Sequence, residues 1–238
     1  MSESSPFVIA VAGSGSNTGK TTLACAIIER LKPRFRTGAL KISTATDDYR
    51  CARTGLPCGC LAFDGPMEVV TDESIILTKG KDTAAFSRAG ADPVWWLKTT
   101  REHSAAAYAT TVQHMHGVEV VLVEGAPPLR ASLADFSILI ARGDGTEPKA
   151  GWFDLVPAAT ALVLTATSGT GGLPALVDRC RAAGLAKEAW VGEFGGSGQT
   201  LPDAGFWRFL DTRLAARAPT GTTKRSTDTA WSPTTSPD

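Results

Sequence analysis

The sequence lacks the long apolar run that a membrane span requires, because no stretch approaches ~20 consecutive apolar residues. It also lacks net charge, since 24 Lys and Arg side chains balance 24 Asp and Glu side chains. A neutral chain has no global field to attract nucleic acid or an anionic lipid surface, so we expect neither as a partner. The first residues, MSESSPF, hold no basic segment followed by an apolar stretch. We therefore expect no signal peptide and a cytoplasmic protein.

Cysteine is scarce and odd in number, which argues against a disulfide framework. Three of the five cysteines, Cys51, Cys58 and Cys60, fall within ten residues. Thiolates at this density could hold Zn²⁺ or an Fe–S cluster with a fourth ligand from elsewhere. The spacing C-x6-C-x-C lacks the C-x2-C pairs typical of zinc sites, so a surface loop with incidental thiols is the alternative. Cys25 and Cys180 fall in segments with helical spacing, and we expect both in the core.

What the sequence does contain is a series of short apolar segments separated by segments with helical spacing. Apolar strands that alternate with helices favour a mostly parallel sheet covered on both faces, a three-layer α/β/α fold. Two short segments, MEVVT and SIILT, predict a hairpin or strand pair. The predicted strands are residues 7–12, 37–43, 92–98, 118–127, 135–142, 159–167 and 189–194, and the predicted helices are 20–31, 103–115, 173–183 and 204–216.

One domain, residues 1–217, accounts for these elements. It carries an insertion-like segment at residues 47–66, which contains the three clustered cysteines. Residues 218–238 are rich in Thr, Ser and Pro and have little to bury, so we expect a disordered tail.

The segment GSGSNTGKTT follows the first strand and opens the first helix. It is close to the phosphate-binding pattern G-x-x-x-x-G-K-[ST], with Ser14 in place of the leading glycine and a glycine on either side of it. A bare backbone lets N–H groups point at phosphates, and the helix adds its positive end. Lys20 would reach the β- and γ-phosphates and the Thr21 hydroxyl would hold Mg²⁺. A chance match is the alternative, and the strand–loop–helix context weakens it. The predicted phosphate-binding residues are Gly15, Ser16, Asn17, Thr18, Gly19, Lys20, Thr21 and Thr22.

Two carboxylates and a second lysine are candidates to complete this site. Glu124 ends the apolar run VVLVE, where a carboxylate at the carboxyl end of a parallel strand faces a ligand site. Asp82 opens a predicted helix, so it is either a metal ligand or an acid of the first helical turn. Lys41 lies inside a predicted buried strand and needs an anion, which could be a phosphate, a substrate carboxylate, Asp47 or Asp48. The chain has no N-K-x-D motif, so the base, GTP or ATP, stays open.

The order of these motifs resembles the molybdopterin-guanine dinucleotide biosynthesis protein B family (MobB). The resemblance covers residues 7–130 and rests on the loop, ALKIS, VEG and above all GKDT followed by AGA. It implies a P-loop GTP-binding fold, a dimer, and molybdopterin or its biosynthetic enzymes as partners. It also implies that Thr21, Asp82 and Glu124 lie near the Mg²⁺ and the γ-phosphate, with Lys20 and Lys41 at the same centre. Unlike that family, this chain has Ile-Ser-Thr instead of histidines after Lys41, and its expected folded part continues for about 85 further residues, from Arg130 to Arg217.

Three functions follow from these motifs. The first is an accessory factor of molybdenum cofactor biosynthesis that binds GTP and hydrolyses it weakly. The second is a small-molecule kinase or ATP-dependent ligase similar to dethiobiotin synthetase. The third is a metallochaperone NTPase that holds metal on Cys51, Cys58 and Cys60.

Overall fold

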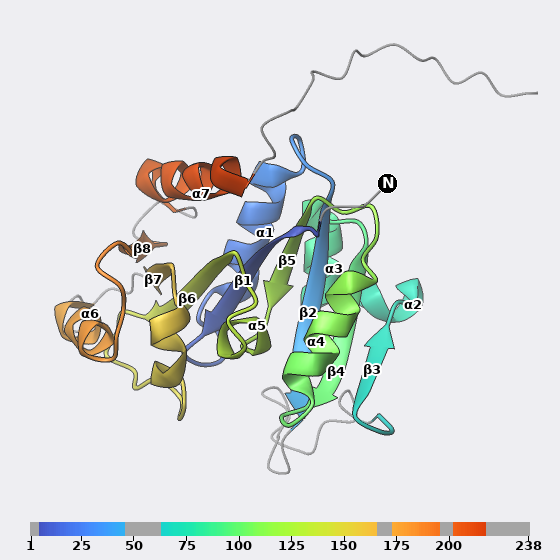
Figure 1. Cartoon of the computed structure of the whole chain (residues 1–238), viewed down its shortest axis with the longest axis horizontal. Helices are drawn as coiled ribbons and strands as arrows, with labels where there is room; N and C mark the ends of the chain where they lie inside the picture. The colour runs from blue at the N-terminus through green and yellow to red at the C-terminus, as the bar shows by residue number, and fades with distance from the viewer. Residues whose placement is uncertain (1–4, 46–62, 166–172, 196–201, 218–238) are drawn as a thin grey trace, which may run out of the picture.

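The structure is a computed structural model that describes residues 5–45, 63–165, 173–195 and 202–217 (Figure 1). One eight-stranded sheet has the order β3-β4-β2-β5-β1-β6-β7-β8. All neighbouring strands are parallel except β3 and β4, which pair antiparallel. The strands are β1 (Phe7–Gly13), β2 (Thr37–Ala45), β3 (Met67–Val70), β4 (Val94–Thr100), β5 (Val120–Glu124), β6 (Phe136–Arg142), β7 (Ala161–Thr165) and β8 (Trp190–Phe194).

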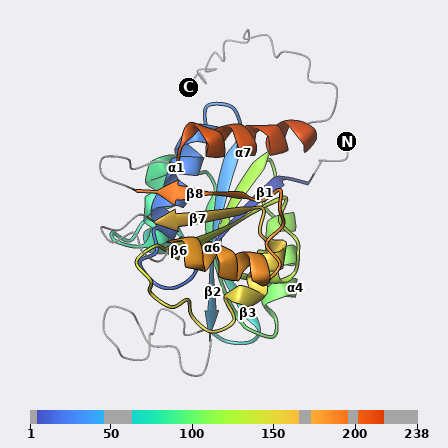
Figure 2. The same ribbon diagram turned by 90° about the vertical axis from the view of Figure 1, so that its left-hand side faces the viewer.

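Helices cover both faces of this sheet, as the alternation of apolar strands and helices predicts. Figure 2 shows α7 and α1 above the strands and α6 below them. The helices are α1 (Lys20–Leu31), α2 (Glu73–Ile76), α3 (Asp82–Ala89), α4 (Ser104–Gln113), α5 (Pro127–Arg130), the 3-10 helix η2 (Phe153–Ala158), α6 (Leu173–Ala182) and α7 (Ala204–Arg217). Among the described residues, no helix has the length and apolar character needed to cross a membrane.

The central strand β1 contributes buried side chains to the core on both faces of the sheet, because successive side chains of a strand point in opposite directions. Ile9 and Val11 pack in one cluster with buried residues of α1, α3 and α7. Ala10 and Ala12 pack in the opposite cluster with buried residues of α5, η2 and α6. These two clusters make the three-layer α/β/α architecture of a P-loop NTPase, as predicted.

Several elements differ from the sequence-based expectation. The predicted pairing of MEVVT with SIILT is wrong, because β3 pairs with β4 and the second segment lies largely in α2. Asp72 explains the helix: its side chain accepts a hydrogen bond from the Ser74 amide at 2.8 Å, which caps the helix N-terminus. The short helices α5 and η2 were not predicted. The insertion and the tail fall mostly outside the described residues.

The two remaining cysteines lie where the helical spacing places them. Cys25 packs partly buried against the cluster around α1, and Cys180 is fully buried in the cluster around α6. Burial raises the pKa of each thiol to about 11. Both therefore remain neutral packing groups at physiological pH.

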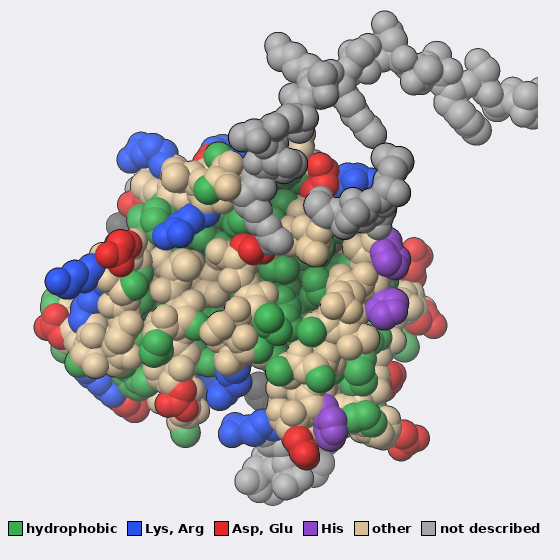
Figure 3. Space-filling view, in the orientation of Figure 1, with side chains coloured by type: hydrophobic (Ala, Val, Ile, Leu, Met, Phe, Trp, Pro, Cys, Tyr) green, Lys and Arg blue, Asp and Glu red, His purple; other side chains and the backbone are tan. Residues whose placement is uncertain are grey.

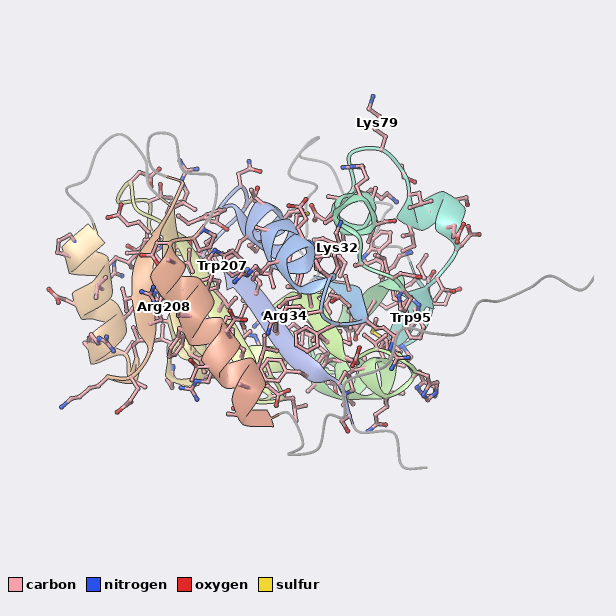
Figure 4. All side chains as sticks on the ribbon, turned by 90° about the horizontal axis from the view of Figure 1, so that it is seen from above. Lys32, Arg34, Lys79, Trp95, Trp207 and Arg208 are labelled. Carbon is pink, nitrogen blue, oxygen red and sulfur yellow. The ribbon has the colours of Figure 1, made fainter. Side chains whose placement is uncertain are left out.

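On the face covered by α7, that helix packs beside α1 through buried apolar side chains, and charged side chains at the surface add further contacts. Arg30 of α1 and Arg34, in the turn that follows α1, both pair with Asp211 of α7, and the Arg30 guanidinium lies 5.7 Å from the Trp207 ring centroid. Figure 4 shows Trp207 between the two helices. These charged groups are a third to a half exposed, so they add little to the buried contacts of Phe206 and Leu210.

Candidate nucleotide and magnesium site

The loop between β1 and α1 has the backbone of a phosphate-binding loop. Gly19 has φ +82°, a left-handed conformation that favours glycine, and Asn17 adopts φ +55°. Space matters most at Gly13: a Cβ there would lie 2.7 Å from Cδ of Lys20, whereas a Cβ on Gly15 would meet nothing within 4 Å. Gly13 precedes Ser14, the residue that replaces the leading glycine of the motif. It therefore leaves the space that the Lys20 side chain occupies next to the backbone. Of the other predicted loop residues, Thr18 is buried, whereas Ser16, Asn17 and Thr22 are exposed.

Lys20 lies over this loop and has no ion pair with a carboxylate among the residues that the structure describes. Its ammonium donates to the Gly15 carbonyl at 2.7 Å and to the Thr18 hydroxyl at 3.3 Å. Burial is the main cause that lowers the pKa of Lys20, and the positive charge of Lys41 acts in the same direction, whereas Glu124 opposes it. A half-buried ammonium with only neutral acceptors favours an incoming anion.

Beside the loop, four side chains close a ring of polar contacts. The Thr21 hydroxyl lies 3.0 Å from Oδ1 of Asp82 and 3.2 Å from Oε2 of Glu124. The Lys41 ammonium lies 2.7 Å from the other oxygen of each carboxylate, Asp82 Oδ2 and Glu124 Oε1. We call Thr21, Lys41, Asp82 and Glu124 the carboxylate ring. Its two acids are thus the anionic partners of Lys41 within the described part of the chain.

Three elements place the carboxylate ring at the carboxyl edge of the sheet. Lys41 of β2 stands opposite Glu124 of β5 in the parallel register, and Val11 of β1 stands opposite Glu124 on its other side. Asp82 is the first residue of α3, directly after Lys81, whose ammonium lies 4.8 Å from the Trp96 ring centroid. Asp82 is therefore both an acid of the first helical turn and a partner of Thr21, so the two alternatives for this residue coincide.

Burial and charge act in opposite directions within the carboxylate ring. Burial by itself lowers the pKa of Lys41, but the negative charges of Glu124 and Asp82 outweigh it, so the pKa rises above its usual value of 10.5. Burial raises the pKa of Asp82, and the Lys41 charge outweighs this and lowers the pKa below 3.8. Glu124 is 2% exposed. The ring therefore sets one ammonium between two carboxyl side chains.

The donor set of the ring fits a magnesium ion. Mg²⁺ prefers oxygen ligands and binds through one or two carboxylates together with substrate phosphates and water. Thr21, Asp82 and Glu124 supply a hydroxyl and two carboxylates on one side of the phosphate loop. Within the described ranges, no group of three or more His, Cys, Asp or Glu side chains is arranged to hold a metal by itself. A site completed by phosphates needs no such group. Cys51, Cys58 and Cys60 lie outside the described residues.

Sequence reasoning missed the residues that flank the two ends of the loop. At one end, Thr165 Cγ2 and Phe194 Cε1 lie 3.2 and 3.4 Å from the position of a Cβ on Gly19. At the other end, the Lys149 amide donates to the Ser14 carbonyl at 2.8 Å. The signal that could have found Lys149 is the glycine-containing loop after β6, because loops at the carboxyl ends of parallel strands line ligand sites.

The parallel sheet, the loop between β1 and α1, and the ring beside it define an α/β fold of the P-loop NTPase class. No family model and no curated protein matches the sequence. Among solved structures, the hydrogenase maturation factor HypB from Archaeoglobus fulgidus is 15% identical, with a TM-score of 0.49, over 87% of this chain and 90% of that chain. A MobB homologue from Bacillus stearothermophilus is 15% identical, with a TM-score of 0.33, over 88% and 99% of the two chains. Likeness at these levels assigns no function to this chain.

Proposed function

We propose that this protein binds a nucleoside triphosphate with Mg²⁺ in the loop between β1 and α1 and promotes attack on its γ-phosphate. The observation that carries the proposal is the convergence of Thr21, Asp82 and Glu124 within 3.2 Å contacts, beside a Lys20 ammonium that has only neutral partners. Neither half of this arrangement is complete without an anion and a divalent cation, and a magnesium–triphosphate complex supplies both.

Each residue of the site then has a distinct task. Lys20 and the backbone amides of residues 15–20 bind the β- and γ-phosphates. Thr21, Asp82 and Glu124 would hold the Mg²⁺, which neutralises charge on the phosphate oxygens. Lys41 contacts both carboxylates at 2.7 Å, so it fixes their positions relative to Thr21, and its charge lowers the pKa of Asp82. Lys41 acts through the carboxylates and is a positioning residue.

Within this class, we propose a GTP-binding accessory factor of molybdenum cofactor biosynthesis that acts as a homodimer with molybdopterin-handling enzymes. The support is the resemblance of GKDT followed by AGA to the MobB family. In the structure this motif spans α3: Gly80 and Gly90 adopt φ +85° and +103° at its two ends. The two glycines therefore allow the left-handed backbone conformations at the ends of α3. Asp82 is the residue of the motif that contacts the site.

A thermal-shift panel of GTP and ATP, each with and without Mg²⁺, tests the proposal. A nucleotide at 100 times its dissociation constant adds about 2.7 kcal/mol to the apparent stability, which raises the melting temperature visibly. We expect the largest rise with Mg²⁺ and GTP. A larger rise with ATP would reject the GTP assignment alone, whereas no rise with any nucleotide would reject the nucleotide site.

A further inference from the structure

Two basic residues outside the carboxylate ring belong to the segments that follow β5 and β6, and the backbone of one of them contacts the phosphate loop. Arg130 ends α5, six residues after Glu124, and Lys149 lies in the segment between β6 and η2. We call Arg130 and Lys149 the basic pair. Both side chains are exposed. Lysine and arginine side chains are visible near the lower edge of the space-filling view, toward which the site-bearing strand ends point (Figure 3).

The backbone fixes Lys149 to the start of the loop. Its amide donates to the carbonyl of Ser14 at 2.8 Å, and the Ser14 amide in turn donates to the Ile140 carbonyl of β6 at 2.9 Å. Ser14 is itself 5% exposed. The backbone of Lys149 is therefore hydrogen-bonded to a buried residue at the start of the loop. Gly19 and the beginning of α1 lie at the other end of the loop.

Arg130 reaches the same segment from α5. Its Nη2 lies 3.7 Å from the position of a Cβ on Gly151, a glycine with φ +71° two residues beyond Lys149. Asp154 Oδ2 lies 3.2 Å from the same position. It forms no ion pair with Arg130, and across the described ranges neither member of the basic pair has a carboxylate partner.

Within the basic pair, Lys149 is the member whose charge acts on a site lysine, and Arg130 acts on Lys149. The Lys149 side chain is exposed overall, but local desolvation of its ammonium, followed by the positive charges of Arg130 and Lys41, lowers the pKa of Lys149. Lys149 is also among the charges that lower the pKa of Lys20. Asp82 and Glu124 are already engaged with Lys41 and Thr21, so they leave this repulsion uncompensated. Clustered cations without acids are stabilised when an oxyanion binds between them.

We infer that Arg130 and Lys149 bind the carboxylate or phosphate of a second, anionic substrate at the Ser14 end of the phosphate loop. This inference rests on the proposed nucleotide site, and it favours a substrate beyond the nucleotide itself. The basic pair comes from α5 and the β6–η2 segment. The phosphates of the nucleotide are proposed to bind elsewhere, to Lys20 and to the backbone amides that lead into α1. The two groups of cations therefore serve two anions at one centre.

The test follows the Ser14 and Lys149 amides by NMR in the full chain, saturated with Mg²⁺ and a nonhydrolysable triphosphate analogue. Inorganic phosphate is titrated in one arm and acetate in the other, at constant ionic strength. We expect the chemical shifts of these two amides to change and to saturate. Tighter binding of phosphate would indicate a phosphate-bearing substrate, and tighter binding of acetate a carboxylate-bearing one. In the double variant Arg130→Ala, Lys149→Ala the affinity falls about tenfold or more, the loss expected when charge-assisted hydrogen bonds are removed.

The matched control removes a lysine and an arginine from elsewhere on the surface. Lys187→Ala with Arg208→Ala changes two exposed side chains, one on the α6–β8 connection and one on α7 (Figure 4), and leaves the probe affinity unchanged. Equal losses in both double variants would mean a general charge effect and would overturn the inference.

Three further outcomes separate the inference from the proposed function. If the wild-type protein binds nucleotide but neither probe, the second-substrate inference is wrong and the nucleotide site stands. If the basic-pair variant loses affinity for the triphosphate analogue but not for the diphosphate, the pair serves the γ-phosphate and the inference is also wrong. If no nucleotide binds at all, the proposed function fails and the inference fails with it.

Discussion

The two sides of the phosphate loop handle charge in opposite ways. On one side, Lys41 of the carboxylate ring forms ion pairs with two acids, and the Thr21 hydroxyl contacts the same two acids. On the other side, Arg130 and Lys149 have no acidic partner among the described residues, and their charges repel. The first side is held in place before any ligand arrives. Under the proposed second-substrate site, an anion would compensate the charges of the second side.

The largest effect is expected between these two sides, at Lys20. Lys20→Ala removes the ammonium that lies over the loop and should weaken nucleotide binding about 1000-fold, equivalent to about 4 kcal/mol. Stability should change little, because the ammonium contacts only Gly15 and the Thr18 hydroxyl. Calorimetry measures the affinity and circular dichroism the fold, with the exposed Lys187→Ala as control. Unchanged affinity in a folded variant would remove Lys20 from the site.

The carboxylate ring should show the next largest effect, as a loss of stability. Lys41→Met leaves Asp82 and the buried Glu124 facing each other without a cation, which should lower the free energy of unfolding by about 3 kcal/mol. Adding Glu124→Gln removes one of the two charges and should recover about 1 kcal/mol or more relative to the sum of the single variants. Urea unfolding of all four proteins measures this coupling. Strict additivity would contradict a preformed ring.

Acid should weaken the ring in a defined direction. The pKa of Asp82 is below its usual 3.8 in the folded protein, so its contribution is fully present above that pH and is lost as the pH falls through the lower, folded value. Because Asp82 is 41% exposed, the contribution is screened to about 1 kcal/mol. Urea midpoints of wild type and Asp82→Asn should differ near pH 6 and converge as the pH falls below the folded-state pKa of Asp82, which lies under 3.8. A constant difference across that range would show that Asp82 is not held ionised by Lys41.

The smallest effect is expected away from both sides, where α7 meets α1. Asp211→Ala removes the partner of Arg30 and Arg34 and should cost about 0.5 kcal/mol, because all three side chains are well exposed. Nucleotide affinity should be unchanged. A loss of affinity measured in the same calorimetric assay would show that α7 is coupled to the loop.

The residues of the proposed nucleotide site were largely identified from local sequence. A strand, a glycine-rich loop and an amphipathic helix appear in order, which places Lys20 and Thr21 without knowledge of the rest. Glu124 was predictable because it ends an apolar strand. Its contact with Lys41 was not, since the two residues are 83 positions apart and meet only through the β2–β5 register.

The basic pair could not be predicted for a related reason. Arg130 and Lys149 converge because β1 lies between β5 and β6, so the segments after both strands reach the loop after β1. This order is a property of the sheet, and the sequence of elements alone does not specify it. The α2 segment was mispredicted because one helical turn is too short to show a helical period, and its Asp72 cap decided the outcome.

The magnesium dependence of triphosphate affinity tests the central claim most directly. Calorimetric titration of wild-type protein with a nonhydrolysable GTP analogue should show one site that binds about tenfold or more tightly with Mg²⁺ than with EDTA, because Thr21, Asp82 and Glu124 then hold the ion against the phosphates. The same titration of Thr21→Val should lose most of that difference. Equal affinity with and without Mg²⁺, or no binding in either condition, would contradict the account.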